Sequence, residues 1–326
     1  MRSALKRLAA LAALGGGIFL LSLSLLPNQG ANLFAKPAIR VVTTSPIFAD
    51  MIQNVGGDRV EVQSIVPVGS DPHAFDPTPR EARAIAQADI LFFNGYQFES
   101  WLQQLIDSAA SPQLIRVQLS EGLHPRPLGS YAAEHHAEHG PAESSAHHGH
   151  EHQHGPYDPH FWLDVTHAMH YVERITAALQ AHDPAGAETY AERAAAYLNE
   201  LRELDSWFFA QIDRIPPENR RLVTYHDAFG YMAERYGLQW IGAVVPNPER
   251  EPSARELADL VRLVRELQVP AIFAEPQINP RFVETLAREA GIAVGTLYSD
   301  TLSAEHPTYI EMMRANAMAL VEGLSP

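Results

Sequence analysis

The sequence predicts an α/β protein with two similar lobes, each a mostly parallel sheet flanked by helices, joined by one long helix. Three observations support this fold class. Short apolar segments alternate with amphipathic ones in both halves of the chain. A helix-favouring stretch rich in Ala, Leu, Glu and Arg separates the halves. About 290 residues remain after the N-terminal segment, more than a single core usually absorbs.

The N-terminus has the pattern of a secretory signal. Arg2, Lys6 and Arg7 precede an almost charge-free apolar run over residues 8–26. We assign residues 1–35 to a signal peptide with cleavage near Ala35. An uncleaved anchor is the alternative, because the run approaches the length of a membrane span. Either reading places the remaining chain outside the cytoplasm.

The first lobe is predicted over residues 36–183 and opens with β-α-β alternation. Gly56 and Gly57 stop its first helix, and a second helix begins near Pro79. Strands are expected at 39–43, 60–66, 88–94 and 114–120, and helices at 45–57, from 79 onward and at 98–109. Alternation at this spacing predicts a parallel sheet covered by helices.

A His-rich stretch interrupts the first lobe at residues 131–155. Eight of the sixteen histidines lie here among Gly, Glu and Ser, with almost no apolar residue. Such a composition cannot form a packed core, so we expect a disordered loop.

The long helix is predicted over residues 184–215, where Pro216 and Pro217 end it. A helix of about 30 residues is roughly 45 Å long and can support both lobes. The second lobe follows at 216–326. Its expected strands are 222–226, 238–245, 271–275 and 293–298, and its helices are 228–237, 253–268, 279–291 and 308–324.

Composition restricts the chemistry. There is no cysteine, which excludes disulfides, thiolate metal sites and a lipidated cysteine. Without the three basic residues of the signal, 21 Lys and Arg face 39 Asp and Glu, a net charge of about −18. Such a chain repels nucleic acid and anionic lipid but suits cations.

Four polar residues lie at comparable places in the predicted lobes. His73, His160 and His226 each stand just beyond a strand or at an element boundary, and Asp300 follows the last strand. Ligand sites of open α/β sheets gather at the carboxyl ends of strands. A proline precedes both His73 and His160 and restricts their backbone. Three imidazoles and one carboxylate form a ligand set that suits Zn²⁺ and is also acceptable to Mn²⁺.

Five motifs, in order around the His-rich stretch, carry a family resemblance: GSDPHAFDPTPR, DPHFWLD, TYHDAFGYMAERYGL, IFAEPQINPR and LYSD. The chain from about Ile39 onward resembles the zinc- and manganese-binding solute proteins of bacterial ABC importers, of the ZnuA and TroA type. The resemblance implies a metal site in the cleft between the lobes, with His73 and His160 from the first lobe and His226 and Asp300 from the second.

The resemblance also implies the function. The expected role is capture of a divalent transition metal in the periplasm and delivery to the membrane permease of an ABC importer, by a monomer without enzymatic activity. Zinc is favoured because manganese-type relatives usually have Glu where this chain has His226, and imidazole is the softer ligand. Manganese remains the alternative, and so does water in place of Asp300 as the fourth ligand.

Several secondary assignments stay open in the sequence. The His-rich stretch resembles the charged loop of zinc-type members and either binds further Zn²⁺ weakly or is a passive insert. Glu275 either supports a ligating histidine or caps a surface turn. A turn or N-cap role is expected for most of the aspartates that lie close in sequence to the ligands, which are Asp76, Asp158, Asp164 and Asp227. An exported zinc hydrolase is disfavoured by the lack of an HExxH motif, and a surface metal-storage protein is the third class.

Overall fold

The computed structural model describes residues 38–128, 156–245, 248 and 250–325, which belong to one compact unit. Two four-stranded sheets, both parallel throughout, form its framework, in the orders β2-β1-β3-β4 and β6-β5-β7-β8. In each sheet the first strand is central, the second lies on one side of it, and the third and fourth on the other. The two lobes therefore share one topology, as the sequence predicted.

The first lobe alternates strands and helices from Ile39 onward. Helix α1 begins after Ser45, whose Oγ accepts the Ile47 backbone N–H, and ends before Gly57, which has a φ of 56°. The strands are β1 Ile39–Thr43, β2 Val60–Ser64, β3 Ile90–Phe93 and β4 Ile115–Gln118, and the helices are α1 Pro46–Gly56, α2 Pro79–Gln87 and α3 Leu102–Ala109. These elements follow the predicted order, with ends trimmed by a few residues.

The second lobe repeats this alternation. Its strands are β5 Arg221–His226, β6 Gln239–Val245, β7 Ala271–Ala274 and β8 Ala293–Thr296. Its helices are α7 Gly230–Tyr236, α8 Ala254–Glu266, α9 Arg281–Ala290 and α10 Tyr309–Leu324. Ser253 and Glu256 form a capping box at the start of α8, which explains why the helix begins there.

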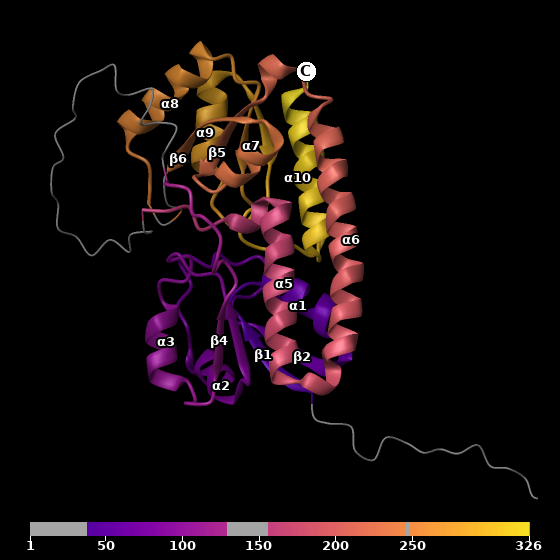
Figure 1. The fold of residues 1–326 in the computed structure, drawn as a ribbon. Helices are drawn as coiled ribbons and strands as arrows, with labels where there is room; N and C mark the ends of the chain where they lie inside the picture. The colour runs from indigo at the N-terminus through magenta and orange to yellow at the C-terminus, as the bar shows by residue number, and fades with distance from the viewer. Residues whose placement is uncertain (1–37, 129–155, 246–247, 249, 326) are drawn as a thin grey trace, which may run out of the picture. The chain divides into compact units, whose positions relative to one another are not determined.

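The long helix α6 runs from Ala187 to Ile212, shorter than the predicted 184–215. A single 3₁₀ turn at Pro184–Gly186 precedes it, and glycine is a poor helix former. Pro216 and Pro217 follow its end and have no N–H to continue the helical hydrogen bonds. Helices α1, α5 and α10 pack along α6 (Figure 1).

Helix α5, Val165–His182, was not among the predicted elements. Its buried positions Val165, Ala168, Val172, Ile175 and Leu179 have helical spacing, so the periodic signal was present in the sequence. Asp164 caps its first turn by accepting the Thr166 backbone N–H, the N-cap role expected for such carboxylates. This helix matters for the site because a 3₁₀ turn at Phe161–Leu163 connects it to His160.

Two sequence predictions lie outside the described residues: the signal peptide at 1–35 and the whole His-rich loop at 131–155. The boundaries proposed for the lobes, 36–183, 184–215 and 216–326, stay predictions. Within the described part of the chain, no helix is long and apolar enough to cross a membrane.

Candidate metal centre

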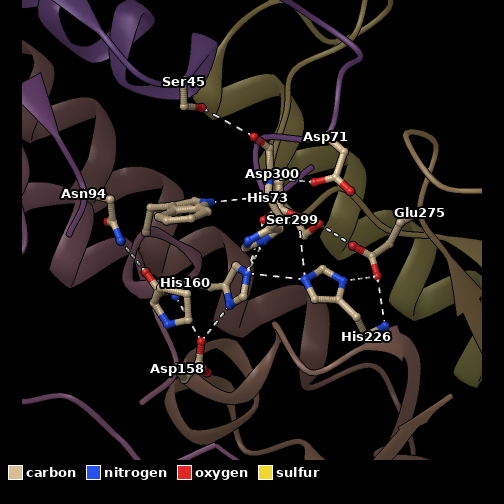
Figure 2. A network of polar contacts seen from close by, with 12 residues as sticks. Ser45, Asp71, His73, Asn94, Asp158, His160, His226, Glu275, Ser299 and Asp300 are labelled. Carbon is tan, nitrogen blue, oxygen red and sulfur yellow. Dashed lines mark hydrogen bonds and ion pairs between the residues drawn. The ribbon is translucent and has the colours of Figure 1, made fainter. Parts of the chain in front are cut away.

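Four side chains from both lobes converge on one point (Figure 2). His73, His160, His226 and Asp300 each offer one ligand atom, and these atoms all lie within 4.8 Å of one another. All four residues are buried, with exposed fractions between 1% and 4%. The structure therefore brings together the complete set of site residues that the sequence predicted.

The distances define the centre of the cluster. His160 Nε2 lies 3.3 Å from Nε2 of both His73 and His226. The carboxylate of Asp300 approaches the same nitrogens, with Oδ1 3.3 Å from His160 Nε2 and Oδ2 3.6 Å from the other two. Three imidazole nitrogens and a carboxylate that face one another at these distances form the donor set of a transition-metal site.

The four residues reach this point from different elements. His73 lies in the loop between β2 and α2, and its ring contacts the edge of Phe98, with ring centroids 4.9 Å apart. His160 directly precedes the 3₁₀ turn before α5. His226 is the last residue of β5, and Asp300 lies in the loop after β8. Both sheets thus contribute at the carboxyl ends of strands.

Buried carboxylates orient two of the histidines from behind. Asp158 Oδ1 lies 2.7 Å from His160 Nδ1, and Glu275 Oε1 lies 2.7 Å from His226 Nδ1. An Nδ1–H that donates to a carboxylate leaves the Nε2 lone pair free to face the centre. The sequence left two roles open for Glu275, a surface cap or a partner of a ligating histidine. Because Glu275 is only 2% exposed and contacts His226, the structure supports the second role.

Asp158 combines both roles that the sequence left open for such carboxylates. Its Oδ1 accepts the backbone N–H of His160 at 2.9 Å, which is a turn contact, and the same oxygen holds the His160 ring. Sequence spacing showed the turn but not the direction of the ring. Phe98, whose ring packs against that of His73 in a T-shaped arrangement, was not predicted as part of the site.

Comparison with known proteins assigns the family. The family model described as the periplasmic component A of the zinc-uptake complex matches residues 41–323, nearly all of the described chain. The chain belongs to this family. It is therefore a metal-binding substrate-binding component of an ABC metal importer and not an enzyme, which rules out the hydrolase alternative.

The relatives of this chain are named for different metals. The manganese-binding lipoprotein MntA of Halalkalibacterium halodurans is 34% identical over 291 residues, which cover 88% of this chain and 89% of the relative. The iron-binding protein YfeA of Yersinia pestis is 31% identical and covers 99% of this chain and 98% of its own. Lipoproteins and periplasmic proteins among the matches place the family outside the cytoplasm.

Solved structures share the fold. The periplasmic metal-binding protein of Candidatus Liberibacter asiaticus is 25% identical with a TM-score of 0.74, covering 87% of this chain and 98% of that one. A crystal structure of ZnuA has a TM-score of 0.73 at 25% identity, covering 88% and 100%. The two-lobed architecture is thus that of the zinc-uptake family.

The charges within the cluster shift the pKa values of His160, His226 and Asp300. Burial lowers the pKa of His160, but the carboxylates of Asp300 and Asp158 outweigh it and raise the pKa to about 10. His226 is affected in the same direction, because Glu275 and Asp300 outweigh its burial. Burial raises the pKa of Asp300, yet the surrounding imidazoles hold it well below the usual range. Because the pKa values of His160 and His226 are raised, a metal cation competes with protons for these two imidazoles when it binds.

Proposed function

We propose that this protein captures Zn²⁺ in the periplasm, as a monomer, through His73, His160, His226 and Asp300, and delivers it to the permease of its importer. The convergence of three buried imidazole nitrogens and one carboxylate on a single point supports this assignment most directly. Such a set completes the four-coordinate shell that Zn²⁺ usually adopts in closed sites. The carboxylates behind His160 and His226 add the preorganisation that a high-affinity site needs.

Manganese is the second candidate, and a specific observation favours it. Several relatives are named for manganese, including MntA, and the Liberibacter protein has a manganese-bound structure. Against it stands the donor set of this chain: imidazole is softer than the oxygen donors that Mn²⁺ prefers. Zinc is therefore our proposal.

Free periplasmic localisation completes the proposal. The basic residues and apolar run of the first 26 positions fit export by a signal peptide. Some relatives are named lipoproteins. The sequence of this chain contains no cysteine that could carry a lipid, which supports a protein that is free in the periplasm.

The test is metal analysis of untagged protein followed by competition between Zn²⁺ and Mn²⁺ in calorimetry. We expect one tight site that prefers Zn²⁺. Alanine substitutions of His73, His160 and His226 should each abolish tight binding. The matched control is His170→Ala, because His170 contacts the Glu121 carbonyl instead of the cluster. Tight binding that persists in the three variants would refute the ligand set, and a preference for Mn²⁺ would refute the choice of metal.

We expect the same titration to show a second, weaker class of Zn²⁺ sites, which belongs to the His-rich stretch. Its histidines are expected to bind further Zn²⁺ weakly, because its composition predicts no packed core and ordering such a segment around a metal would cost conformational entropy. Deletion of residues 134–154 should therefore remove a weak class of sites and leave the tight one. Loss of the tight site in this deletion would mean that the stretch supplies a ligand.

A further inference from the structure

An arginine lies behind the carboxylate that orients His160. Arg126 Nη1 is 3.3 Å from Asp158 Oδ2, while Asp158 Oδ1 contacts Nδ1 of the histidine. The Asp158 side chain is fully buried and that of Arg126 is 17% exposed. Because water screens this ion pair little, the guanidinium is an effective partner for the buried carboxylate. A continuous chain of polar contacts thus runs from Arg126 to the metal centre.

The backbone fixes Arg126 relative to Asp158. The Asp158 backbone N–H donates to the Arg126 carbonyl at 2.9 Å, and the Leu128 N–H donates to the Pro156 carbonyl at 3.1 Å. Pro127 and Tyr157 form an antiparallel bridge between these two bonds. The arginine and the aspartate therefore stand on two paired segments and keep a constant separation.

Residues of the second lobe contact Arg126 and leave space for its guanidinium. Gly230, the first residue of α7, approaches Arg126 so closely that an added Cβ would lie 1.4 Å from Nη1. Its neighbour Tyr231 accepts the Arg126 backbone N–H at 3.0 Å and donates to the Asp158 carbonyl at 3.0 Å. Only a glycine leaves room for the arginine here. Helix α7 starts four residues after His226, so this contact joins the segments that present two of the proposed ligands.

We propose that Arg126, seated against Gly230 and Tyr231, is a positioning residue that holds Asp158 and through it the His160 ring in the ligating orientation. This inference rests on the proposed function of the cluster as a metal site. Without the guanidinium, the buried carboxylate loses its partner on one side and turns more freely, and the imidazole loses its fixed direction. The affinity of the site and the rate of metal release then depend on a residue that does not touch the metal.

The experiment measures Zn²⁺ affinity, Zn²⁺ release rate and the visible spectrum of the Co²⁺-loaded protein for a set of variants. Arg126→Gln should weaken Zn²⁺ binding about tenfold, as is usual for partners behind metal ligands, and change the Co²⁺ spectrum. Arg126→Lys, which keeps the charge, should recover part of the loss. Gly230→Ala should act like Arg126→Gln because its methyl group displaces the guanidinium. Tyr231→Phe removes the hydroxyl that accepts the Arg126 backbone N–H and donates to the Asp158 carbonyl, and so tests the backbone contact of the same two segments.

A double variant separates this mechanism from general destabilisation. Arg126→Gln with Gly230→Ala should bind Zn²⁺ no more weakly than either single variant, because both remove the same contact. The matched control is Arg59→Gln, since Arg59 pairs with the buried Asp183 of the same lobe and contacts none of the four ligands. Its Zn²⁺ affinity and Co²⁺ spectrum should equal those of the wild type.

Arg126→Gln with wild-type affinity and spectrum would overturn the proposal, and so would fully additive losses in the double variant. Failure of the proposed function has a different signature: the wild-type protein itself would lack a tight site, or His160→Ala would retain it. Melting of each apo-protein shows that the variants compared are folded.

Discussion

At the scale of single residues, the site depends on where each ring nitrogen faces. The imidazoles of His160 and His226 each have a carboxylate at Nδ1 and the shared centre at Nε2. Asp300 contributes the negative charge within that centre, and its lowered pKa keeps it ionised at all physiological pH values. It is therefore the residue whose removal most changes the balance between soft and hard metals.

Asp300→Ala tests this balance. Since loss of a group behind a ligand already costs about 10–100-fold in affinity, loss of a ligand should weaken Zn²⁺ binding by at least about a hundredfold. Mn²⁺ should lose more, because it relies more on oxygen donors while three imidazoles still suit zinc. Competition titrations of both metals measure the two losses. Asp213→Ala, at a carboxylate that is 75% exposed, is the control. Equal affinities before and after the change would remove Asp300 from the ligand set.

At the scale of elements, one buried carboxylate organises the loop after β3. Glu99 Oε1 accepts the Thr44 hydroxyl and the Asn94 backbone N–H, both at 2.7 Å. The side-chain amide of Asn94 then donates to the Pro159 carbonyl at 2.8 Å, next to His160. The loop therefore links the end of β3 to the segment that presents a proposed ligand.

This arrangement predicts a pH-dependent stability. Burial raises the pKa of Glu99 to about 7 although its hydrogen bonds oppose the shift. Between pH 4.5 and 7 the folded state retains a proton that the unfolded state has lost, so the stability contributed by this group falls as the pH rises. From the pKa difference, the fall is about 3 kcal/mol. Well above pH 7 Glu99 is ionised in both states and its contribution no longer changes.

Urea unfolding of apo-protein at pH 5 and pH 7.5 measures this fall, with Glu99→Gln as the comparison. The wild type should lose about 2 kcal/mol more than the variant between the two pH values, because most of the titration of Glu99 falls in this interval and glutamine does not titrate. Other titrating groups cancel in the difference. The same pH dependence in both proteins would show that Glu99 is ionised throughout.

At the scale of the whole described unit, α6 makes contacts with elements of both lobes. Near its C-terminal end, Phe208 stacks on Tyr236 of α7 with ring centroids 4.0 Å apart. Toward its N-terminal end, Tyr190 is fully buried and donates to Asp183, the partner of Arg59. One continuous apolar core includes residues of β1, α1, α5, α6 and α10. We therefore expect the two lobes to unfold together.

Phe208→Ala tests this coupling. The side chain is fully buried, and a Phe→Ala change in a core typically costs about 3–5 kcal/mol. The neighbouring Phe209 is 37% exposed, so Phe209→Ala should cost much less and serves as the matched control. Urea unfolding followed separately by circular dichroism and tryptophan fluorescence should give a single transition in all three proteins. Two separate transitions would contradict the coupling of the lobes.

The sequence by itself determined the α/β class, the alternation of strands and helices and the four residues of the candidate site. The elements follow from local rules, since periodicity and turn residues specify them. The site follows in part from the rule that the carboxyl ends of parallel strands meet at one edge, and in part from the family resemblance, because His160 precedes a 3₁₀ turn and does not end a strand. Helix α5 was also visible in the spacing of its apolar residues, although it was not predicted. The tertiary structure alone decided that Asp158 and Glu275 stand behind His160 and His226, and that Arg126 occupies the space left by Gly230. Those contacts join residues far apart in the chain, and the direction of a side chain depends on its packed neighbours rather than on sequence spacing.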